Sequence, residues 1–407
     1  MRKMDPEMQR WIELHAADDP VKLRLRYHGD DDIAFAITQI ECRRKAGNRF
    51  PAALASPGFM FPTGLSAEQA TSEALARIHA GIAGYQPGAR HLDLTCGLGM
   101  DAFEAARHGA LVTSVDINPE VVEAARHNAK ALGLDDKLEA VCGDSTALVA
   151  DTDMTCDTIF IDPARRGEGG RRLTAIAECS PDVTTIMPRM LELAPKIVVK
   201  ASPMLDLTAL ASELDAACGG RGCVTRMITV GTTRECKEVI AVVERGAATH
   251  YQTEAITALP ACDTPSIFAP SRHCEAAPVL PGLPSAGEYL YEPYPAVMKT
   301  AAWGALAALA PELRQLHPNT HLFTADTEVK NFPGTAMRIE RVEPLSDKAL
   351  KAIAREWPKI NVATRNFIIS APELAKRLRI KEGGVARLYG VRSGAAATLA
   401  IIVAVPF

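Results

Sequence analysis

The chain has 407 residues, of which 47% are hydrophobic and 23% are charged, which is ordinary for a soluble globular protein. This length is too great for one ordinary core and predicts two or three domains. No run approaches the roughly eighteen apolar residues of a membrane helix, and the N-terminus lacks the apolar stretch of a signal peptide. The composition therefore argues against membrane-spanning and secreted proteins.

Charge is unevenly distributed along the chain. Residues 330–407 contain fourteen Lys or Arg against six Asp or Glu, a balance of +8, whereas the whole chain carries −4. A basic module joined to an acidic body favours a polyanionic partner over a membrane.

The ten cysteines are scattered, so we expect reduced thiols in a cytoplasmic protein. Cys218 and Cys223 flank a Gly-Gly-Arg-Gly turn, and His273-Cys274 lies far downstream. Because no pair has the short ligand spacing of a zinc site, no metal is expected.

The first 85 residues predict a helical N-terminal domain. Asp31 and Asp32 precede an apolar run, and acids in the first turn suit the dipole of a helix. A Pro- and Gly-rich stretch follows at 56–64, and Ser66 with Gln69 has the spacing of a capping box that would start another helix.

Residues 86–246 alternate between strand-like and helix-like runs, which predicts a parallel sheet with helices on both faces. The expected strands are His91–Leu94, Leu111–Asp116, Leu138–Cys142, Thr158–Asp162 and Ile197–Lys200. The expected helices include Asp101–His108, Pro119–Leu132 and Leu207–Ala217. Val224–Val230 and Glu238–Val243 are joined by a link too short for a helical crossover, so they predict an antiparallel hairpin at the sheet edge.

Residues 246 to about 290 are rich in Pro, Ala and Ser and are expected to form a linker. Helices are predicted after it at Pro295–Ala310, Ser346–Glu356 and Pro372–Leu378, and strands at Ala336–Val342 and Ala397–Val405. This mixture predicts a C-terminal α+β module.

The loop after the first expected strand contains Asp93, Gly97 and Gly99. Glycines there let the backbone approach a ligand closely. The spacing also fits the loose dinucleotide pattern, but a pyrophosphate would meet the negative charge of Asp93. That charge suits a cationic amine instead.

Two more acids follow the next strands. Asp116 is placed to accept hydrogen bonds from two ribose hydroxyls, and Asp144 from an adenine amino group. An ammonium, a ribose and an adenine without a phosphate describe S-adenosylmethionine. This constellation, with the terminal hairpin, resembles the class I methyltransferases, which implies a Rossmann-like α/β sheet. The residues expected to bind this cofactor are Asp93, Thr95, Gly97, Gly99, Asp116, Ile117, Asp144 and Ser145.

The run Asp162-Pro163-Ala164-Arg165 follows the fourth strand. In the enzymes it resembles, this position carries an Asp/Asn-Pro-Pro-aromatic or an Asp-Pro-Pro/Ala-Arg motif. There the carboxylate and the proline carbonyl accept hydrogen bonds from an amino or imino group of a base. The resemblance therefore implies that Asp162, Pro163 and Arg165 are catalytic and orient a nitrogen lone pair for in-line attack.

The same run is most similar to the RNA 5-methyluridine enzymes, which attack with a cysteine just after the fifth strand. In this chain Ala201 stands at the matching position. Without a thiolate, uracil C5 cannot be activated by covalent addition, so a ring or exocyclic nitrogen is the better target. Cys236 is a distant alternative nucleophile and is better interpreted as structural.

A basic, glycine-containing loop follows the catalytic run. Its members are Arg165, Arg166, Gly167, Gly169, Gly170, Arg171 and Arg172. We expect this loop to contact substrate phosphates, with Lys200 and Arg234 extending the basic rim from neighbouring strand ends. The alternative is a solvated basic loop without a partner.

Beyond the core, the chain resembles a bacterial family of methyltransferases with a C-terminal THUMP-like domain. The matching stretches are 68–73, 162–165, 234–238, 291–296, 365–367 and 381–384. The resemblance implies a helical domain at 1–85 and an S-adenosylmethionine-binding domain at 86–246. A linker with a small ferredoxin-like segment is then expected at 247–330, and a THUMP-like α+β domain at 331–407.

THUMP domains bind structured RNA, so the resemblance implies a tRNA or rRNA substrate, and the local charge agrees. The expected RNA contacts in this domain are Lys376, Arg377, Arg379 and Lys381. Only 5% of residues are aromatic, which argues against extended stacking platforms for single strands. Recognition of a folded RNA by shape and phosphates fits better.

Three other functions stay open. A DNA or small-molecule methyltransferase shares the chemistry, although the basic module argues against a small metabolite. A catalytically idle RNA-binding protein would not need the intact set of acids and glycines. A nicotinamide oxidoreductase would place its cofactor on Asp93.

Overall fold

The computed structural model describes residues 4–165, 175–246, 250–260, 262–271 and 274–407. The chain divides into two compact units. One consists of residues 1–230 and 238–251, and the other of residues 231–237 and 252–407. Among the described residues, no helix combines the length and the apolar character needed to cross a bilayer.

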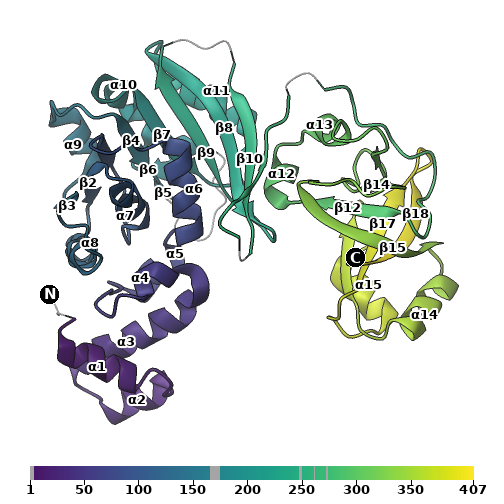
Figure 1. Cartoon of the computed structure of the whole chain (residues 1–407), viewed down its shortest axis with the longest axis horizontal. Helices are drawn as coiled ribbons and strands as arrows, with labels where there is room; N and C mark the ends of the chain where they lie inside the picture. The colour runs from purple at the N-terminus through teal and green to yellow at the C-terminus, as the bar shows by residue number, and fades with distance from the viewer. Residues whose placement is uncertain (1–3, 166–174, 247–249, 261, 272–273) are drawn as a thin grey trace. The chain divides into compact units, whose positions relative to one another are not determined.

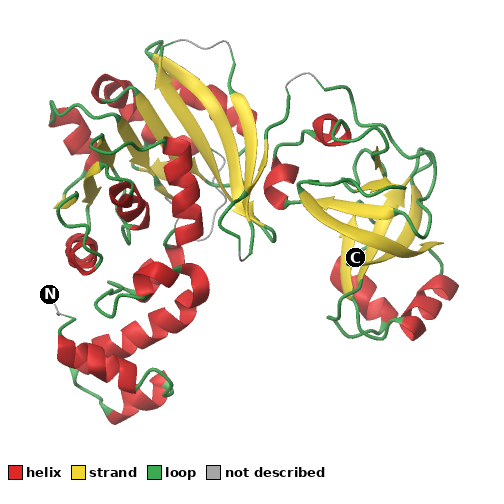
Figure 2. Ribbon diagram, viewed as in Figure 1, coloured by secondary structure: helices red, strands yellow, loops and turns green. Residues whose placement is uncertain are grey.

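The first part of the N-terminal unit is helical, as predicted (Figure 2). Its helices are α1 (Pro6–Leu14), α2 (Pro20–Arg26), α3 (Asp31–Ala46), α4 (Pro51–Leu54), α5 (Gly64–Gln69) and α6 (Glu73–Ala83), with a 3-10 turn at Gly47–Arg49. The capping box expected at Ser66 is wrong. Thr63 caps α5 by accepting from the Ser66 amide, and α6 begins after Ser72, whose hydroxyl accepts from the Leu75 amide.

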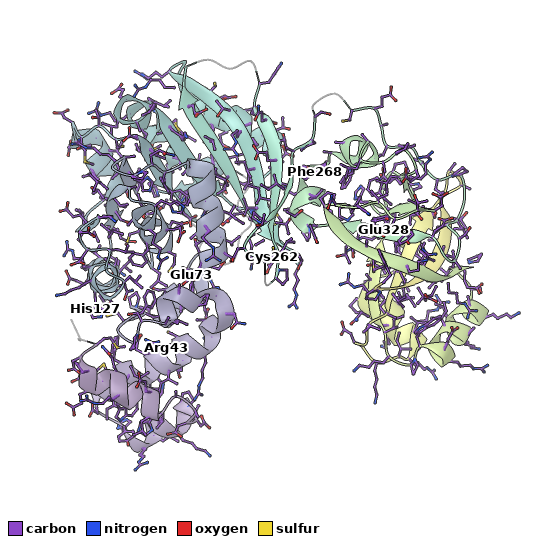
Figure 3. All side chains as sticks on the ribbon, in the orientation of Figure 1. Arg43, Glu73, His127, Cys262, Phe268 and Glu328 are labelled. Carbon is purple, nitrogen blue, oxygen red and sulfur yellow. The ribbon has the colours of Figure 1, made fainter. Side chains whose placement is uncertain are left out.

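Polar contacts join these helices to one another and to the sheet domain. Arg43, Glu73 and His127 are labelled in Figure 3. Arg43 donates to the carbonyls of the 57–59 turn, and the Glu73 carboxylate accepts from two amides at the start of α4. His127 of α8 (Pro119–Ala131) donates to the Gly58 carbonyl at 2.8 Å. The helical region is therefore fastened to the sheet domain by side chains as well as by the chain.

The sheet of this unit contains five parallel strands and an antiparallel pair. Its strands are β1 (Arg90–Asp93), β2 (Leu111–Asp116), β3 (Leu138–Cys142), β4 (Thr158–Ile161), β7 (Lys196–Ala201), β8 (Gly222–Thr232) and β9 (Cys236–Arg245). They run in the spatial order β8-β9-β7-β4-β1-β2-β3, with β9 antiparallel to β7. The predicted parallel sheet and its antiparallel hairpin are confirmed, although the hairpin is not the last pair of strands in the sheet, whose full order has nine strands. A separate ribbon pairs β5 (Ala164–Arg165) with β6 (Cys179–Ser180).

Helices cover both faces of this sheet (Figure 1). The remaining helices are α7 (Met100–Arg107), α9 (Ser145–Asp151), α10 (Val183–Leu193), α11 (Leu207–Ala217) and a 3-10 turn at Ile176–Glu178. Helices α6 and α7 pack together, whereas α9, α10 and α11 form another group. The larger core lies under α10 and α11, where buried Met187, Met190 and Leu214 meet the apolar residues of β4, β7 and β9. This core holds the ends of the parallel strands in fixed positions.

The C-terminal unit is an α+β module built on a seven-stranded sheet, as the sequence predicts. The sheet has the order β13-β14-β12-β15-β18-β17-β16. These strands are β12 (Tyr289–Pro293), β13 (Arg314–Gln315), β14 (Phe323–Ala325), β15 (Gly334–Pro344), β16 (Asn361–Arg365), β17 (Arg387–Ser393) and β18 (Thr398–Val405). Helices α14 (Asp347–Glu356) and α15 (Ala371–Leu378) bury Ile353 and Leu374 against its apolar face.

Two expectations for this unit are wrong. The stretch interpreted as a linker contains β10 (Gln252–Ala258) and β11 (Ser266–Phe268), which pair antiparallel. The helix expected at Pro295–Ala310 is divided into α12 (Pro295–Lys299) and α13 (Trp303–Ala307). Ala301 between them has φ +53°, a left-handed conformation that an α-helix cannot continue.

Candidate active site

Four neighbouring parallel strands bring the predicted acids to one edge of the sheet. β1 ends at Asp93, β2 at Asp116, β3 just before Asp144 and β4 just before Asp162. The register pairs β1 with β2 and β4 in parallel, so all four carboxyl ends point the same way. This edge is where α/β sheets of this kind hold their ligands.

The loop after β1 has the backbone conformation that its glycines permit. Gly97 and Gly99 both have left-handed backbones, with φ of +52° and +88°. A Cβ on Gly99 would lie 2.7 Å from the Phe103 ring, so the loop also needs the missing side chain there. The exposed Gly97 amide donates to Oδ2 of Asp116 at 3.0 Å, which ties the loop to the end of β2.

Asp93 lies buried at the root of this loop. Its two carboxylate oxygens accept from the Thr95 amide at 3.0 Å and from the Ser114 hydroxyl at 2.7 Å. Burial raises the pKa of Asp93 to about 7, although both hydrogen bonds oppose the rise. The Thr95 hydroxyl accepts from the Asp162 amide at 2.7 Å, so the loop also fixes the end of β4.

Asp116 and its neighbour form an open acceptor surface. The Asp116 carboxylate is half-buried and also accepts from the Asn118 amide at 2.9 Å, so each oxygen keeps a lone pair for a ligand hydroxyl. Ile117 is 73% exposed, and an apolar side chain this exposed beside a carboxylate suits the face or edge of an adenine.

Asp144 and Ser145 complete the third strand end. Exposed Asp144 caps α9 by accepting from the Thr146 amide at 2.7 Å. Ser145 donates to the Leu94 carbonyl at 2.7 Å and connects this end to β1. Three carboxylates and an exposed isoleucine fit a cationic nucleoside without phosphate, and a pyrophosphate would meet repulsion here. The donor and acceptor set therefore fits S-adenosylmethionine.

Asp162 and Pro163 lie directly after β4. The Asp162 side chain is 41% exposed, and its Oδ2 accepts from Lys200 Nζ at 2.7 Å. Pro163 is buried, and β5 begins at the next residue. Arg165 belongs to β5, but its side chain and the whole of Arg166, Gly167, Gly169, Gly170, Arg171 and Arg172 lie outside the described residues.

The expectation that Lys200 extends an exposed basic rim is not met. Its side chain is only 12% exposed, and Nζ has three partners within 3.4 Å: Asp162, Glu238 and the Thr71 hydroxyl. A lysine so enclosed cannot reach an RNA phosphate and instead provides a countercharge for Asp162. Arg234 lies in the turn between β8 and β9, which belongs with the C-terminal unit.

Sequence reasoning assigned no role to two buried charged groups near Lys200. Glu238 and His79 are almost fully buried and lie 2.6 Å apart, between Oε1 and Nε2. The 234–238 stretch was a signal for Glu238, because it is one of the family-matching runs. A lone histidine on the apolar helix α6 carried no such signal.

No thiol occupies the position that carbon methylation would need. Ala201 ends β7 and is buried. Cys236 begins β9 and is partly buried. No cluster of metal-ligating side chains occurs among the described residues.

The predicted basic residues of the C-terminal unit are all exposed around the end of α15. Glu373 is held in a capping box with Ser370, so it does not neutralise them. Arg377 donates to Asp347 at 2.6 Å, which removes one charge from the set. Within the described ranges, no ion pair is found for Lys376, Arg379 or Lys381.

A cavity of about 280 Å³ lies at the opposite edge of the parallel sheet. It is lined by residues at the starts of β1, β2 and β3, including Arg90, Leu111 and Lys137. It contains none of the candidate residues, and we assign it no role.

Comparison with known protein families identifies the domains. Residues 86–202 match a methyltransferase domain, residues 289–333 a ferredoxin-like domain and residues 334–404 a THUMP domain-like family. A candidate methyltransferase from Porphyromonas gingivalis W83, known as a crystal structure, is 28% identical. The alignment covers 98% of this chain and 97% of that one, with a TM-score of 0.81. The chain therefore combines a methyltransferase domain with ferredoxin-like and THUMP-like domains, and the fold class expected from the sequence is confirmed.

Curated relatives match a shorter segment. An uncharacterised RNA methyltransferase of Parasynechococcus marenigrum is 36% identical over 90 residues, which is 22% of this chain and 19% of that protein. The 23S rRNA (uracil(1939)-C(5))-methyltransferase RlmD of a Shewanella species is 42% identical over 89 residues, 20% of this chain and 18% of that protein. The chain thus spans about a fifth of the length of these relatives.

Proposed function

We propose that this protein is an S-adenosylmethionine-dependent methyltransferase that modifies a base nitrogen of a structured RNA, either tRNA or rRNA. The observation that carries the proposal is the convergence of Asp93, Asp116, Asp144 and Asp162 at the carboxyl edge of one parallel sheet. Three of these acids suit the cofactor, and the fourth suits the group that accepts the methyl.

The cofactor would be held by the loops after β1, β2 and β3. Asp116 would accept from the ribose hydroxyls, Asp144 from the adenine amino group and Asp93 from the ammonium group, beside the Gly97–Gly99 backbone. Thr95, Ile117 and Ser145 would complete these contacts. When bound, S-adenosylmethionine supplies a methyl group on a sulfonium, whose sulfur is a good leaving group.

Asp162 and Pro163 would orient the acceptor. An Asp162 carboxylate oxygen and the Pro163 carbonyl can accept from an amino or imino group of a base, which directs the nitrogen lone pair. Arg165 would assist at the same strand end, and Arg166 would contact substrate phosphate. If the substrate is tRNA or rRNA, the protein acts in the cytoplasm.

The relatives named as uracil-C5 enzymes favour carbon as a second candidate target. Carbon attack requires a thiolate to add to the uracil ring first. Buried Ala201 at the end of β7 argues against that chemistry, so nitrogen is the better target.

RNA binding would rest on the C-terminal unit and its charge. Lys376, Arg379 and Lys381 are exposed on the THUMP-like domain, and Arg377 is exposed beside Asp347. Arg234 would add a further contact.

Transfer of a labelled methyl group to total RNA tests the proposal. RNA should be taken from cells that lack the protein, so that the acceptor is unmodified. We expect label in RNA that is removed by ribonuclease and not by deoxyribonuclease. Label only in DNA or in small molecules would replace the RNA proposal by one of those alternatives, and no transfer despite S-adenosylmethionine binding would favour an idle RNA-binding protein.

A further inference from the structure

A chain of ionic contacts extends from Asp162 to helix α6 of the same unit. Lys200 Nζ on β7 lies 2.7 Å from Asp162 Oδ2 and 3.4 Å from Oε2 of Glu238 on β9. It also donates to the Thr71 hydroxyl at 3.0 Å. Glu238 in turn contacts His79 of α6. The reactive strand end is thus linked to a helix of the N-terminal region.

His79 contacts carboxylates with both ring nitrogens. Nδ1 lies 2.7 Å from Asp101 Oδ1, and Nε2 lies 2.6 Å from Glu238 Oε1. Only a protonated imidazole has two N–H groups to donate to two carboxylates. Burial alone would lower the pKa of His79, but the two carboxylates outweigh it and raise that pKa to about 10.

Three carboxylates, on Asp101, Glu238 and Asp162, face two cations, Lys200 and protonated His79. The side chains of Asp101 and Glu238 are 14% and 5% exposed, against 41% for Asp162, so Asp162 is the carboxylate of this array that a ligand can reach.

Stability alone is a poor reason for such an array. Buried ion pairs are often no more stabilising than apolar side chains of similar volume, because desolvation offsets the attraction. This array also uses residues from three stretches, 68–73, 162–165 and 234–238, that the family resemblance marks and cofactor binding leaves without a role. Their convergence at Lys200 gives them a common one.

We propose that Lys200, Glu238 and His79 are positioning residues that hold Asp162 as an anion with Oδ2 occupied and Oδ1 available to the methyl acceptor, which makes α6 part of the catalytic unit. This inference rests on the proposed function of Asp162. Within the described residues, no hydrogen bond to Asp162 Oδ1 is found. Asp93 and Asp101 are two further acids whose negative charges interact with the Asp162 carboxylate.

The array gives the released proton a destination. The target nitrogen forms its bond to the methyl carbon with its lone pair, and the electron pair of the broken S–C bond stays on the leaving sulfur. The proton of the methylated nitrogen moves to Oδ1 of Asp162 and from there to water. Asp162 must therefore be ionised at the start of each turnover, and activity is lost as the pH falls through its pKa, which burial raises although Lys200 opposes the rise.

Changing the charges around Asp162 tests this role. Lys200→Met removes a cation, so the acid limb of the kcat profile should move to higher pH by about one to two pH units, the size of a lost charge-assisted hydrogen bond. Glu238→Gln removes a nearby anion, so the limb should move to lower pH. Both variants should lower kcat, by about tenfold or more through misplacement of Asp162, and leave S-adenosylmethionine affinity unchanged. Lys200→Arg keeps the charge and should restore the wild-type limb.

Glu104→Gln is the matched control, because it neutralises another buried carboxylate of the same unit, one paired with Arg107 rather than with the array. Its profile should not move. The proposal is overturned if the acid limb of the kcat profile stays in place in both Lys200→Met and Glu238→Gln, or if it moves in the same direction in both.

A second measurement does not depend on activity. In protein labelled with ¹⁵N-histidine, His79 should show the chemical shifts of an imidazolium at about pH 8, where an ordinary histidine is neutral. Glu238→Gln should bring its titration to lower pH. If the wild type fails to methylate RNA but His79 behaves in this way, the proposed function is at fault and the ionic array stands; a neutral His79 at that pH would overturn the array.

Discussion

Replacement of Asp116 by alanine separates cofactor binding from folding. The Asp116 carboxylate accepts from the Gly97 amide at 3.0 Å and from the Asn118 amide at 2.9 Å. We propose that the same oxygens accept from the ribose hydroxyls. Asp116→Ala therefore removes the ligand contact and loosens the glycine loop that faces the ligand.

The size of the effect follows from the kind of contact. Charge-assisted hydrogen bonds contribute about 1.5–3 kcal/mol, which corresponds to a roughly 10- to 150-fold loss of affinity for S-adenosylmethionine. Ligand present at about 1,000 times Kd stabilises a protein by about 4.1 kcal/mol, and a hundredfold weaker binding reduces this to about 1.4 kcal/mol.

Calorimetric titration and thermal unfolding with and without ligand measure both quantities. Asp30→Ala is a matched control, because Asp30 also accepts from two backbone amides, at the start of α3. It should cost about 0.5–2 kcal/mol of stability, the cost of losing a helix cap, and leave affinity unchanged. Unchanged affinity in a folded Asp116→Ala protein would refute the assignment of the ribose site to Asp116.

Three further predictions concern the acceptor, the ammonium group and the RNA. Asp162→Ala should abolish methyl transfer to RNA while calorimetry shows little change in cofactor affinity. Asp157→Ala, at the other end of β4, is the control and should keep its activity. An Asp162→Ala protein that still methylates RNA would contradict the proposal. Burial raises the pKa of Asp93 to about 7, so cofactor affinity should rise between about pH 6 and 8 as this carboxyl ionises. Asp93→Asn should remove the rise. If the affinity of the wild-type protein does not rise over this range, Asp93 does not contact the ammonium group. The third prediction concerns a variant that replaces all four exposed basic residues of the α15 region, namely Lys376, Arg377, Arg379 and Lys381. It should weaken RNA binding, reduce the slope of log affinity against log salt by about 0.9 for each lost phosphate contact, and raise KM more than it lowers kcat. Arg341→Ala is the control, because Arg341 is already paired with Glu343 and Glu356. If the four-residue variant has the same slope as this control, the four charges are only solvated.

The methyltransferase sheet was predictable because its signals are local. Strands β2 and β3 begin and end at the predicted residues, and Asp116 and Asp162 stand at strand ends where the order of strands alone brings them to one edge. The Gly97–Gly99 loop was predictable for the same reason, since a left-handed backbone requires glycine there.

The ionic array was not predictable, because its contacts are distant in sequence. His79 and Glu238 are 159 residues apart, and Lys200 and Thr71 are 129 apart. A lysine at a strand end has the same local pattern whether it faces solvent or a buried carboxylate. Only the packing of α6 beside the sheet decides that Lys200 is enclosed.

Local patterns also failed where two of them competed. Ser66 and Gln69 have capping-box spacing, but Thr63 lies three residues earlier and takes the cap. The composition of the stretch before residue 290 suggested a linker, yet alternating residues such as Thr253, Ala255 and Thr257 belong to a strand. Ala301 interrupts the expected helix although alanine favours helices, because its left-handed backbone cannot continue one.

Nucleoside analysis of the methylated RNA tests the central claim most directly. Total RNA from cells that lack the protein is incubated with the protein and labelled S-adenosylmethionine, digested to nucleosides, and separated with mass detection. The account predicts one labelled nucleoside that carries its methyl group on a base nitrogen, and no such product with Asp162→Ala. Label in 5-methyluridine, or an equal yield with the Asp162 variant, would contradict it.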